Sequence, residues 1–122
     1  MRRFSFIHQY DSMQCGIACL QMVCKYFGRD YSLESLSKLC FVTTEGTSML
    51  GINEAANTIG LYTVCARTTI TVLSDAPLPC ILHWNQNHFV VLYRVKNDKK
   101  FHVADPGKGL VTYNLEEFKQ HW

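Results

Sequence analysis

Cys15 lies where a polar segment meets the first residues of an amphipathic helical pattern. The N-terminus of a helix carries unsatisfied backbone N–H groups and a partial positive charge, which favour a thiolate and lower the pKa of a thiol placed there. Gln9 lies six positions upstream, far enough for the chain to bring its amide beside the sulfur. These two residues predict a cysteine nucleophile with a side-chain donor for an oxyanion.

A cysteine nucleophile needs a base, and the base needs a group that orients it. Among the five histidines, His88 opens a strongly apolar segment, so its ring can protrude at a strand end. Asp105 ends the following segment, before Pro106. If residues 88–95 and 100–105 form a hairpin, the ends that carry His88 and Asp105 lie side by side. The sequence therefore predicts that Asp105 orients His88.

Each of these residues also has a simpler explanation. Cys15 has the type and setting of a buried core thiol, although Gly16 leaves open space beside it. Asp105 before Pro106 is typical of a turn, and His88 could be a strand-end histidine with a structural role. Their order along the chain and their expected elements make the set more specific than any one member.

A metal site is the competing chemical interpretation. Cys80, His83 and His88 supply ligand types that zinc accepts. Cys80 and His83 are an odd number of positions apart on a predicted strand, so their side chains face opposite sides. We therefore expect neither a metal nor a cofactor, and we interpret His102 as a surface or core-edge residue.

The elements that would position these residues change period halfway along the chain. Helical spacing and helix-ending glycines predict helices in the first half, and alternation predicts strands in the second. A capping-box pattern opens a last helix. Helices followed by an antiparallel sheet indicate an α+β fold. The expected helices cover residues 15–27, 33–40, 49–59 and 115–122; the expected strands cover 61–67, 80–84, 88–95, 100–105 and 109–113, with a short helical or irregular connection at 68–75.

Bulk properties exclude several classes of protein. A chain of 122 residues suits one domain, and its net charge of +2 is too small to indicate a nucleic-acid or anionic-membrane partner. No apolar run is long enough for a transmembrane helix or a signal peptide. The six cysteines form no CxxC pair, which argues against a disulfide framework and favours the reducing cytosol.

Four motifs in order resemble cysteine peptidase family 39, the double-glycine leader peptidases at the N-terminus of peptide-exporting ABC transporters. The motifs are Gln9-x-Asp-x-x-x-Cys-Gly-x-Ala-Cys-Leu-x-Met, Gly46-Thr-Ser-Met-Leu-Gly, His88-Phe-Val-Val-Leu and Ala104-Asp-Pro. The resemblance implies a papain-like fold with N-terminal helices packed on a C-terminal antiparallel sheet. It also implies that Cys15 is the nucleophile, His88 the general base and acid, and Asp105 the orienting group. Gln9 and the backbone N–H of Cys15 would form the oxyanion hole.

The implied reaction removes a leader from a bacteriocin-like or signalling precursor peptide after Gly-Gly or Gly-Ala, coupled to export. The leader would dock as an amphipathic helix in an apolar groove, to which we assign Met49 and Leu50. The implied partners are the precursor and the transmembrane and ATPase domains of the parent exporter, at the cytosolic face of the bacterial inner membrane. Residues 1–122 would be its single N-terminal peptidase domain, monomeric when isolated.

Two departures and two alternatives accompany this resemblance. The position before the nucleophile, often acidic in the family, is Gln14 here, and the chain stops at Trp122, about where a final strand of the family would follow. Some secretion exporters carry a degenerate version of the domain that only binds substrate, so a non-catalytic docking module is the alternative function. A third hypothesis is a papain-like thiol enzyme that acts on another acyl substrate.

Overall fold

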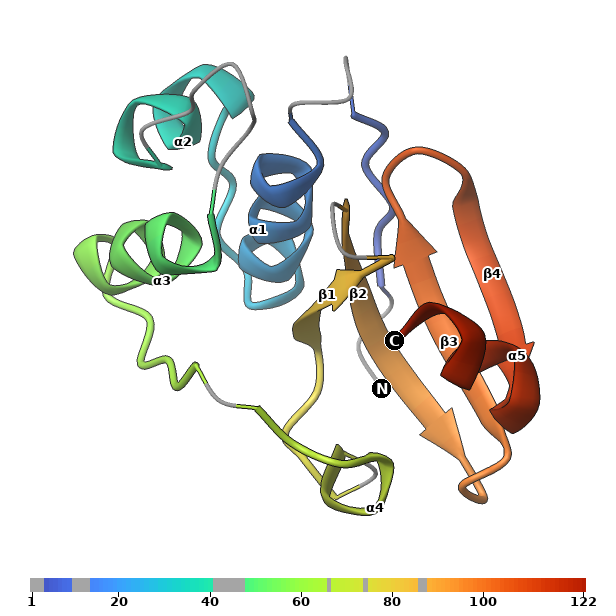
Figure 1. The fold of residues 1–122 in the computed structure, drawn as a ribbon. Coiled ribbons are helices and arrows are strands. Elements are labelled where there is room, and N and C mark those ends of the chain that lie inside the picture. Colours follow the sequence, from blue (N-terminus) through green and yellow to red (C-terminus); the bar gives the residue numbers. More distant parts are fainter. Residues whose placement is uncertain (1–3, 10–13, 41–47, 66, 74, 86–87) are drawn as a thin grey trace.

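A computed structural model describes residues 4–9, 14–40, 48–65, 67–73, 75–85 and 88–122. Figure 1 shows the N-terminal helices beside an antiparallel sheet, with α1 lying between α2 and α3 on one side and the strands on the other. The predicted α+β fold is confirmed. The helices are α1 (Cys15–Tyr26), α2 (Leu33–Cys40), α3 (Met49–Thr58), α4 (Ile70–Leu73) and α5 (Leu115–His121); the strands are β1 (Cys80–Trp84), β2 (His88–Lys96), β3 (Lys100–Asp105) and β4 (Gly109–Asn114).

The helix ends follow from local side-chain chemistry. The Ser48 hydroxyl accepts a hydrogen bond from the Gly51 N–H at 3.0 Å and so caps the first turn of α3. At the start of α5, Asn114 and Glu117 form the predicted capping box, with hydrogen bonds of 2.9 and 3.0 Å. Gly28 follows α1 in the left-handed region, at φ 81°, as a helix-terminating glycine does.

The strand predicted for residues 61–67 is wrong. Residues 61–65 form no strand, and residue 66 lies outside the described part of the chain. The Thr63 hydroxyl instead lies within hydrogen-bond distance of the side-chain Oδ1 atoms of Asn53 and Asn57 on α3. Side-chain contacts with a helix, and not a sheet ladder, hold this segment.

The hairpin between β2 and β3 forms as predicted. Lys96 and Lys100 are Cα partners at its end, and Asn97 and Asp98 adopt left-handed φ values of 54° and 56°. Two consecutive left-handed residues match the twist of antiparallel strands, and asparagine and aspartate tolerate that conformation well. The sheet order is β1-β2-β3-β4, so β2 and β3 are its central strands.

Both faces of the central strands are buried. Phe89 and Val91 of β2 belong to the core that contains α1, whereas Val90 and Leu92 belong to a second core with Phe118 of α5. Burial on two sides fixes the central strands firmly, and these strands carry His88 and Asp105 at their ends. Within the described ranges, no helix is long and apolar enough to cross a membrane.

Candidate active site

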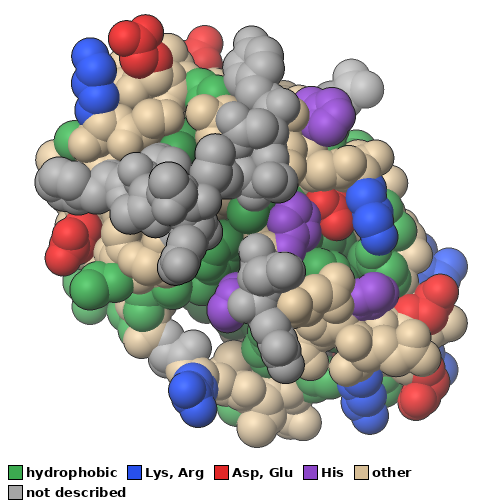
Figure 2. Space-filling model, turned by 45° about the horizontal axis from the view of Figure 1, so that its top comes forward, with side chains coloured by type: hydrophobic (Ala, Val, Ile, Leu, Met, Phe, Trp, Pro, Cys, Tyr) green, Lys and Arg blue, Asp and Glu red, His purple; other side chains and the backbone are tan. Residues whose placement is uncertain are grey.

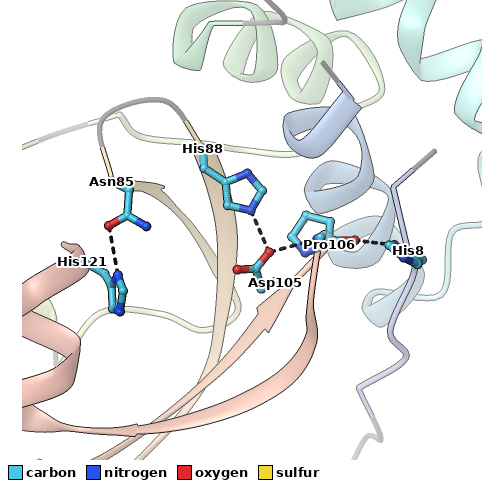
Figure 3. Close-up of polar contacts among 7 residues, drawn as sticks. His8, Asn85, His88, Asp105, Pro106 and His121 are labelled. Atoms are coloured by element: carbon cyan, nitrogen blue, oxygen red, sulfur yellow. Dashed lines mark hydrogen bonds and ion pairs between the residues drawn. The ribbon is translucent and has the colours of Figure 1, made fainter. Parts of the chain in front are cut away.

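His88 and Asp105 meet at the same end of the two central strands. His88 is the first residue of β2 and Asp105 is the last residue of the neighbouring antiparallel strand β3. The Nε2 atom of His88 lies 2.7 Å from Oδ1 of Asp105 (Figure 3). The backbone N–H of Gly107 donates to the same oxygen at 2.9 Å, and Asp105 is only 2% exposed. The hairpin geometry predicted from the sequence therefore brings these two side chains together.

The contact shifts both pKa values toward an ion pair. The hydrogen bond to Asp105 is the largest cause that raises the pKa of His88, to about 9, and burial opposes it. Burial pushes the pKa of Asp105 upward, but the hydrogen bonds from His88 and from the Gly107 N–H outweigh it and leave the pKa below its usual value. At neutral pH, His88 is therefore an imidazolium and Asp105 is a carboxylate.

Cys15 completes a chain of three side chains. It is a buried residue at the start of α1, and its thiol interacts with the His88 side chain. Because Nε2 of His88 is bonded to Asp105, Nδ1 is the ring nitrogen left for the thiol. Burial is the largest influence on the Cys15 pKa and raises it, but the His88 hydrogen bond, the Phe89 backbone N–H, the His88 charge and the Gly16 backbone together lower that pKa below its ordinary value.

Gln9 lies next to the turn that follows Asp105. Its backbone N–H donates to the Pro106 carbonyl at 2.9 Å, and Nδ1 of His8 donates to the same carbonyl at 2.7 Å (Figure 3). A Cβ added at Gly107 would lie 3.5 Å from Asp105 Oδ1 and 3.6 Å from Gln9 Oε1. The N-terminal arm thus brings the Gln9 amide to the same turn as Asp105.

Comparisons with known proteins show the family of this chain. The model of the peptidase C39 family matches residues 3–122. The chain belongs to the peptidase C39 family. The resemblance drawn from the four motifs is thereby confirmed, and the enzyme class is cysteine peptidase.

Three similar proteins illustrate the family. The probable microcin-H47 secretion/processing ATP-binding protein MchF of Escherichia coli is 36% identical over 99% of this chain, which spans 17% of that relative's length. A double-glycine motif protease from an AMS/PCAT transporter, solved with its leader peptide, has a TM-score of 0.93 at 35% identity and covers 99% of this chain and 86% of its own. The peptidase domain of Streptococcus ComA gives 0.85 at 29% identity, with 98% and 93% covered.

The pH dependence of Cys15 reactivity follows from these pKa shifts. Alkylation of the C39 domain by iodoacetamide is expected to stay fast at pH values where an ordinary thiol is protonated, because the Cys15 pKa is lowered. A second transition in the rate of Cys15 alkylation is expected near pH 9, where His88 loses its proton. Mass spectrometry of the Cys15 peptide across a pH series measures both transitions. A Cys15 that reacts only at the alkaline pH of a free thiol would contradict the thiolate–imidazolium pair.

The two predicted substrate-binding residues have different surroundings. Met49 lines a hollow of about 540 Å³ between α1, α3 and the segments 61–65 and 76–81. Leu50 does not line this hollow, and 64% of it is exposed. Tyr62 and Val64 also line the hollow and are 94% and 76% exposed. The sequence does not identify them as contact residues, because the alternating pattern of this segment predicts a strand.

The competing metal site has little support in the structure. Across the described parts of the chain, no three His, Cys, Asp or Glu side chains gather closely enough to hold a metal ion. Burial raises the pKa of the Cys80 thiol to about 12, and the ring of His83 stacks on Phe89. All six cysteines are free. His102, partly buried on β3, contacts the Thr112 hydroxyl at 3.2 Å, as a core-edge residue would.

Figure 2 shows how side chains are distributed over one face of the molecule. Near the middle of this face a histidine side chain lies directly beside an acidic one, and hydrophobic side chains lie around them.

Proposed function

We propose that Cys15, His88 and Asp105 are the catalytic residues of a leader peptidase that cleaves after Gly-Gly or Gly-Ala. The observation that carries the proposal is the 2.7 Å bond between His88 and Asp105, and it is supported by the buried Cys15 thiol that interacts with His88. A structure in the same family contains a double-glycine motif protease with its leader peptide. That relative supports the substrate class.

The reaction begins when the Cys15 thiolate attacks the carbonyl carbon of the second glycine. His88 then gives its proton to the leaving amine, and a covalent acyl-enzyme remains. Water, activated by the now neutral His88, hydrolyses this thioester and releases the leader. Asp105 keeps the imidazole oriented and stabilises its charged form throughout.

The oxyanion formed at each step needs hydrogen-bond donors. The backbone N–H of Cys15 is one of the first N–H groups of α1 and has no carbonyl partner within the helix. The Gln9 side chain supplies the second donor in our proposal, since the arm places its amide beside the Asp105 turn. Two donors aimed at one developing charge form an oxyanion hole.

The hollow between α1 and α3 is the docking groove for the leader in this proposal. Leu20 and Val23 of α1 and Ile52 of α3 line it, together with the exposed Tyr62 and Val64. An apolar groove of this kind suits the apolar face of an amphipathic helix. Met49 contributes to its wall, whereas Leu50 is not among the lining residues and is not one of the proposed contacts.

Charged substitutions in this groove test the docking site. Tyr62→Asp and Val64→Asp are expected to raise the KM for a leader-bearing precursor roughly tenfold or more and to leave kcat nearly unchanged, because each removes apolar contact area. Leu110→Asp is the matched control, since Leu110 is 54% exposed on β4 and lies outside the lining. Equal effects of all three substitutions on KM would remove the groove from the docking site.

The relatives also suggest the setting of the reaction. MchF and ComA are named as transport and processing proteins that bind ATP or act as ABC transporters. We infer that residues 1–122 form the N-terminal peptidase domain of such an exporter at the cytosolic face of the bacterial inner membrane. Its partners would be the precursor peptide and the transmembrane and ATPase domains, and the isolated domain would be a monomer.

Cleavage of a precursor peptide tests the proposed function. The protein is incubated with a peptide whose leader ends in Gly-Gly, and with a matched peptide carrying Leu at the second glycine. Mass spectrometry is expected to show a single cut after the second glycine in the first peptide only. Binding without any cut would favour a docking module, and cleavage only of unrelated acyl substrates would favour a different thiol enzyme.

A further inference from the structure

A second set of contacts holds the chain just before His88. Asn85 follows β1, and its backbone N–H donates to the carbonyl of His121, the last residue of α5, at 2.9 Å. Nδ1 of His121 donates in turn to the side-chain Oδ1 of Asn85 at 2.9 Å (Figure 3). Asn85 has a left-handed φ of 50°, which asparagine adopts more readily than most residues. Two hydrogen bonds therefore join the end of α5 to Asn85.

The ring of His121 is itself held in place by aromatic side chains. It stacks on Trp84, with ring centroids 5.1 Å apart and an interplanar angle of 16°, and its centroid lies 5.3 Å from that of Tyr113. Trp84 is fully buried and also packs edge-on against Phe118. His121 thus contacts two consecutive residues, Trp84 and Asn85, and connects both to the core around α5.

These two residues are directly linked to the catalytic base. Trp84 and His88 are Cα partners in the ladder between β1 and β2, so a shift of Trp84 or Asn85 moves the strand position opposite His88. The His88 ring has to reach Asp105 through Nε2 and the thiol through its other nitrogen. Simultaneous contacts on both ring nitrogens leave little tolerance for such a shift.

We propose that His121 and Asn85 form a positioning clamp for His88. Neither residue touches the reacting atoms, so both are positioning residues. The clamp acts by fixing where β2 begins, and through it the contacts of the imidazole with Asp105 and Cys15. The proposal rests on the proposed role of His88 in catalysis.

Substitutions in the clamp should change kcat and the behaviour of Cys15 but not substrate binding. His121→Ala is expected to lower kcat roughly 10- to 100-fold, with KM nearly unchanged because no residue of α5 lines the groove. It should also move the alkaline transition of Cys15 alkylation below pH 9, because the raised His88 pKa depends on the Asp105 contact. His121→Asn retains a donor to Oδ1 and should restore most of both properties.

A milder variant and a matched control accompany His121→Ala. Asn85→Gly allows the left-handed backbone and keeps its N–H donor, removes the side chain with its Oδ1 acceptor, and should reproduce part of the defect. The double variant should lose little more than His121→Ala alone, since both changes break one clamp. His102→Ala removes a histidine that is bonded to Thr112 and takes no part in the clamp. It should leave kcat and the alkylation profile unchanged.

Alkylation reports on the clamp without any substrate, so its outcome is separate from the identity of the cleaved peptide. If His121→Ala and Asn85→Gly lower only the melting temperature and leave kcat and the alkaline transition at their original values, the contacts are purely structural and the proposal is wrong. A change confined to KM would overturn it as well, because it would place the effect on substrate binding.

Discussion

Cys15→Ala is expected to abolish cleavage of a double-glycine precursor while leader binding stays within about twofold of its original value. Loss of the nucleophile in a catalytic triad costs on the order of 10⁶ in kcat, which lies below detection for a peptidase of ordinary rate. The leader groove does not include Cys15, so the apolar contacts that bind the leader persist. Product formation followed by mass spectrometry and binding measured by calorimetry test the two halves separately.

Cys24→Ala is the matched control for this variant. Cys24 lies on the same helix, is fully buried, and burial raises its pKa, so it has the properties of a structural thiol. Its replacement is expected to lower stability and to leave kcat unchanged. Residual cleavage by Cys15→Ala, or loss of leader binding in that variant, would contradict the assignment of Cys15 as nucleophile.

Gln9→Ala is expected to lower kcat by about 10²–10³-fold with little change in KM, which is the usual cost of losing one oxyanion donor. The Gln9 Oε1 atom is buried and has no hydrogen-bond partner among the described residues. Because no group is hydrogen-bonded to this atom, its removal leaves no buried partner without a hydrogen bond. The free energy of unfolding should therefore change little. Steady-state kinetics and thermal unfolding of the same preparations measure both quantities.

Gln21→Ala provides the comparison for Gln9. Gln21 is a glutamine on α1 whose Nε2 donates to the Tyr31 carbonyl at 3.0 Å, and it lies away from the Asp105 turn. Its loss should affect stability and spare kcat. An unchanged rate in Gln9→Ala would remove Gln9 from the oxyanion hole and leave the Cys15 backbone N–H as the proposed donor.

Gln14, the residue before the nucleophile, is neutral. It precedes Cys15, and its side chain does not cap the helix; the first turn of α1 contains no acidic residue either. A carboxylate beside the sulfur would raise the Cys15 pKa by like-charge repulsion. With a neutral amide in this place, the hydrogen bonds and charge of His88 and the Phe89 N–H lower that pKa without an opposing charge.

The site was predictable from sequence where local rules decide the geometry. The Asn97–Lys99 turn joins β2 to β3 as an antiparallel hairpin, so the strand ends that carry His88 and Asp105 lie at the same end of the sheet, although the register shifts once between Leu92 and Arg94. The helix start at Cys15 follows from the amphipathic pattern beyond it. In each case a short segment determines its own conformation, so the spacing of residues carries the information.

Contacts between distant segments were not predictable in the same way. Whether residues 61–65 pair in a sheet depends on a neighbouring strand, and alternation cannot show whether one exists; here Thr63 bonds to α3 instead. The same limit applies to the bond between His8 and Pro106, 98 positions apart, and to the clamp of His121 on Asn85. Tertiary packing selects these partners, and no local pattern encodes them.

Covalent capture of the nucleophile tests the central claim most directly. The protein is treated with a leader peptide that ends in a Gly-Gly chloromethyl ketone, and the site of attachment is mapped by mass spectrometry. We predict one adduct per chain, on Cys15, with the exposed thiol of Cys65 unmodified. Attachment at Cys65, or no adduct on Cys15 while the peptide is bound, would contradict a leader peptidase that acts through Cys15.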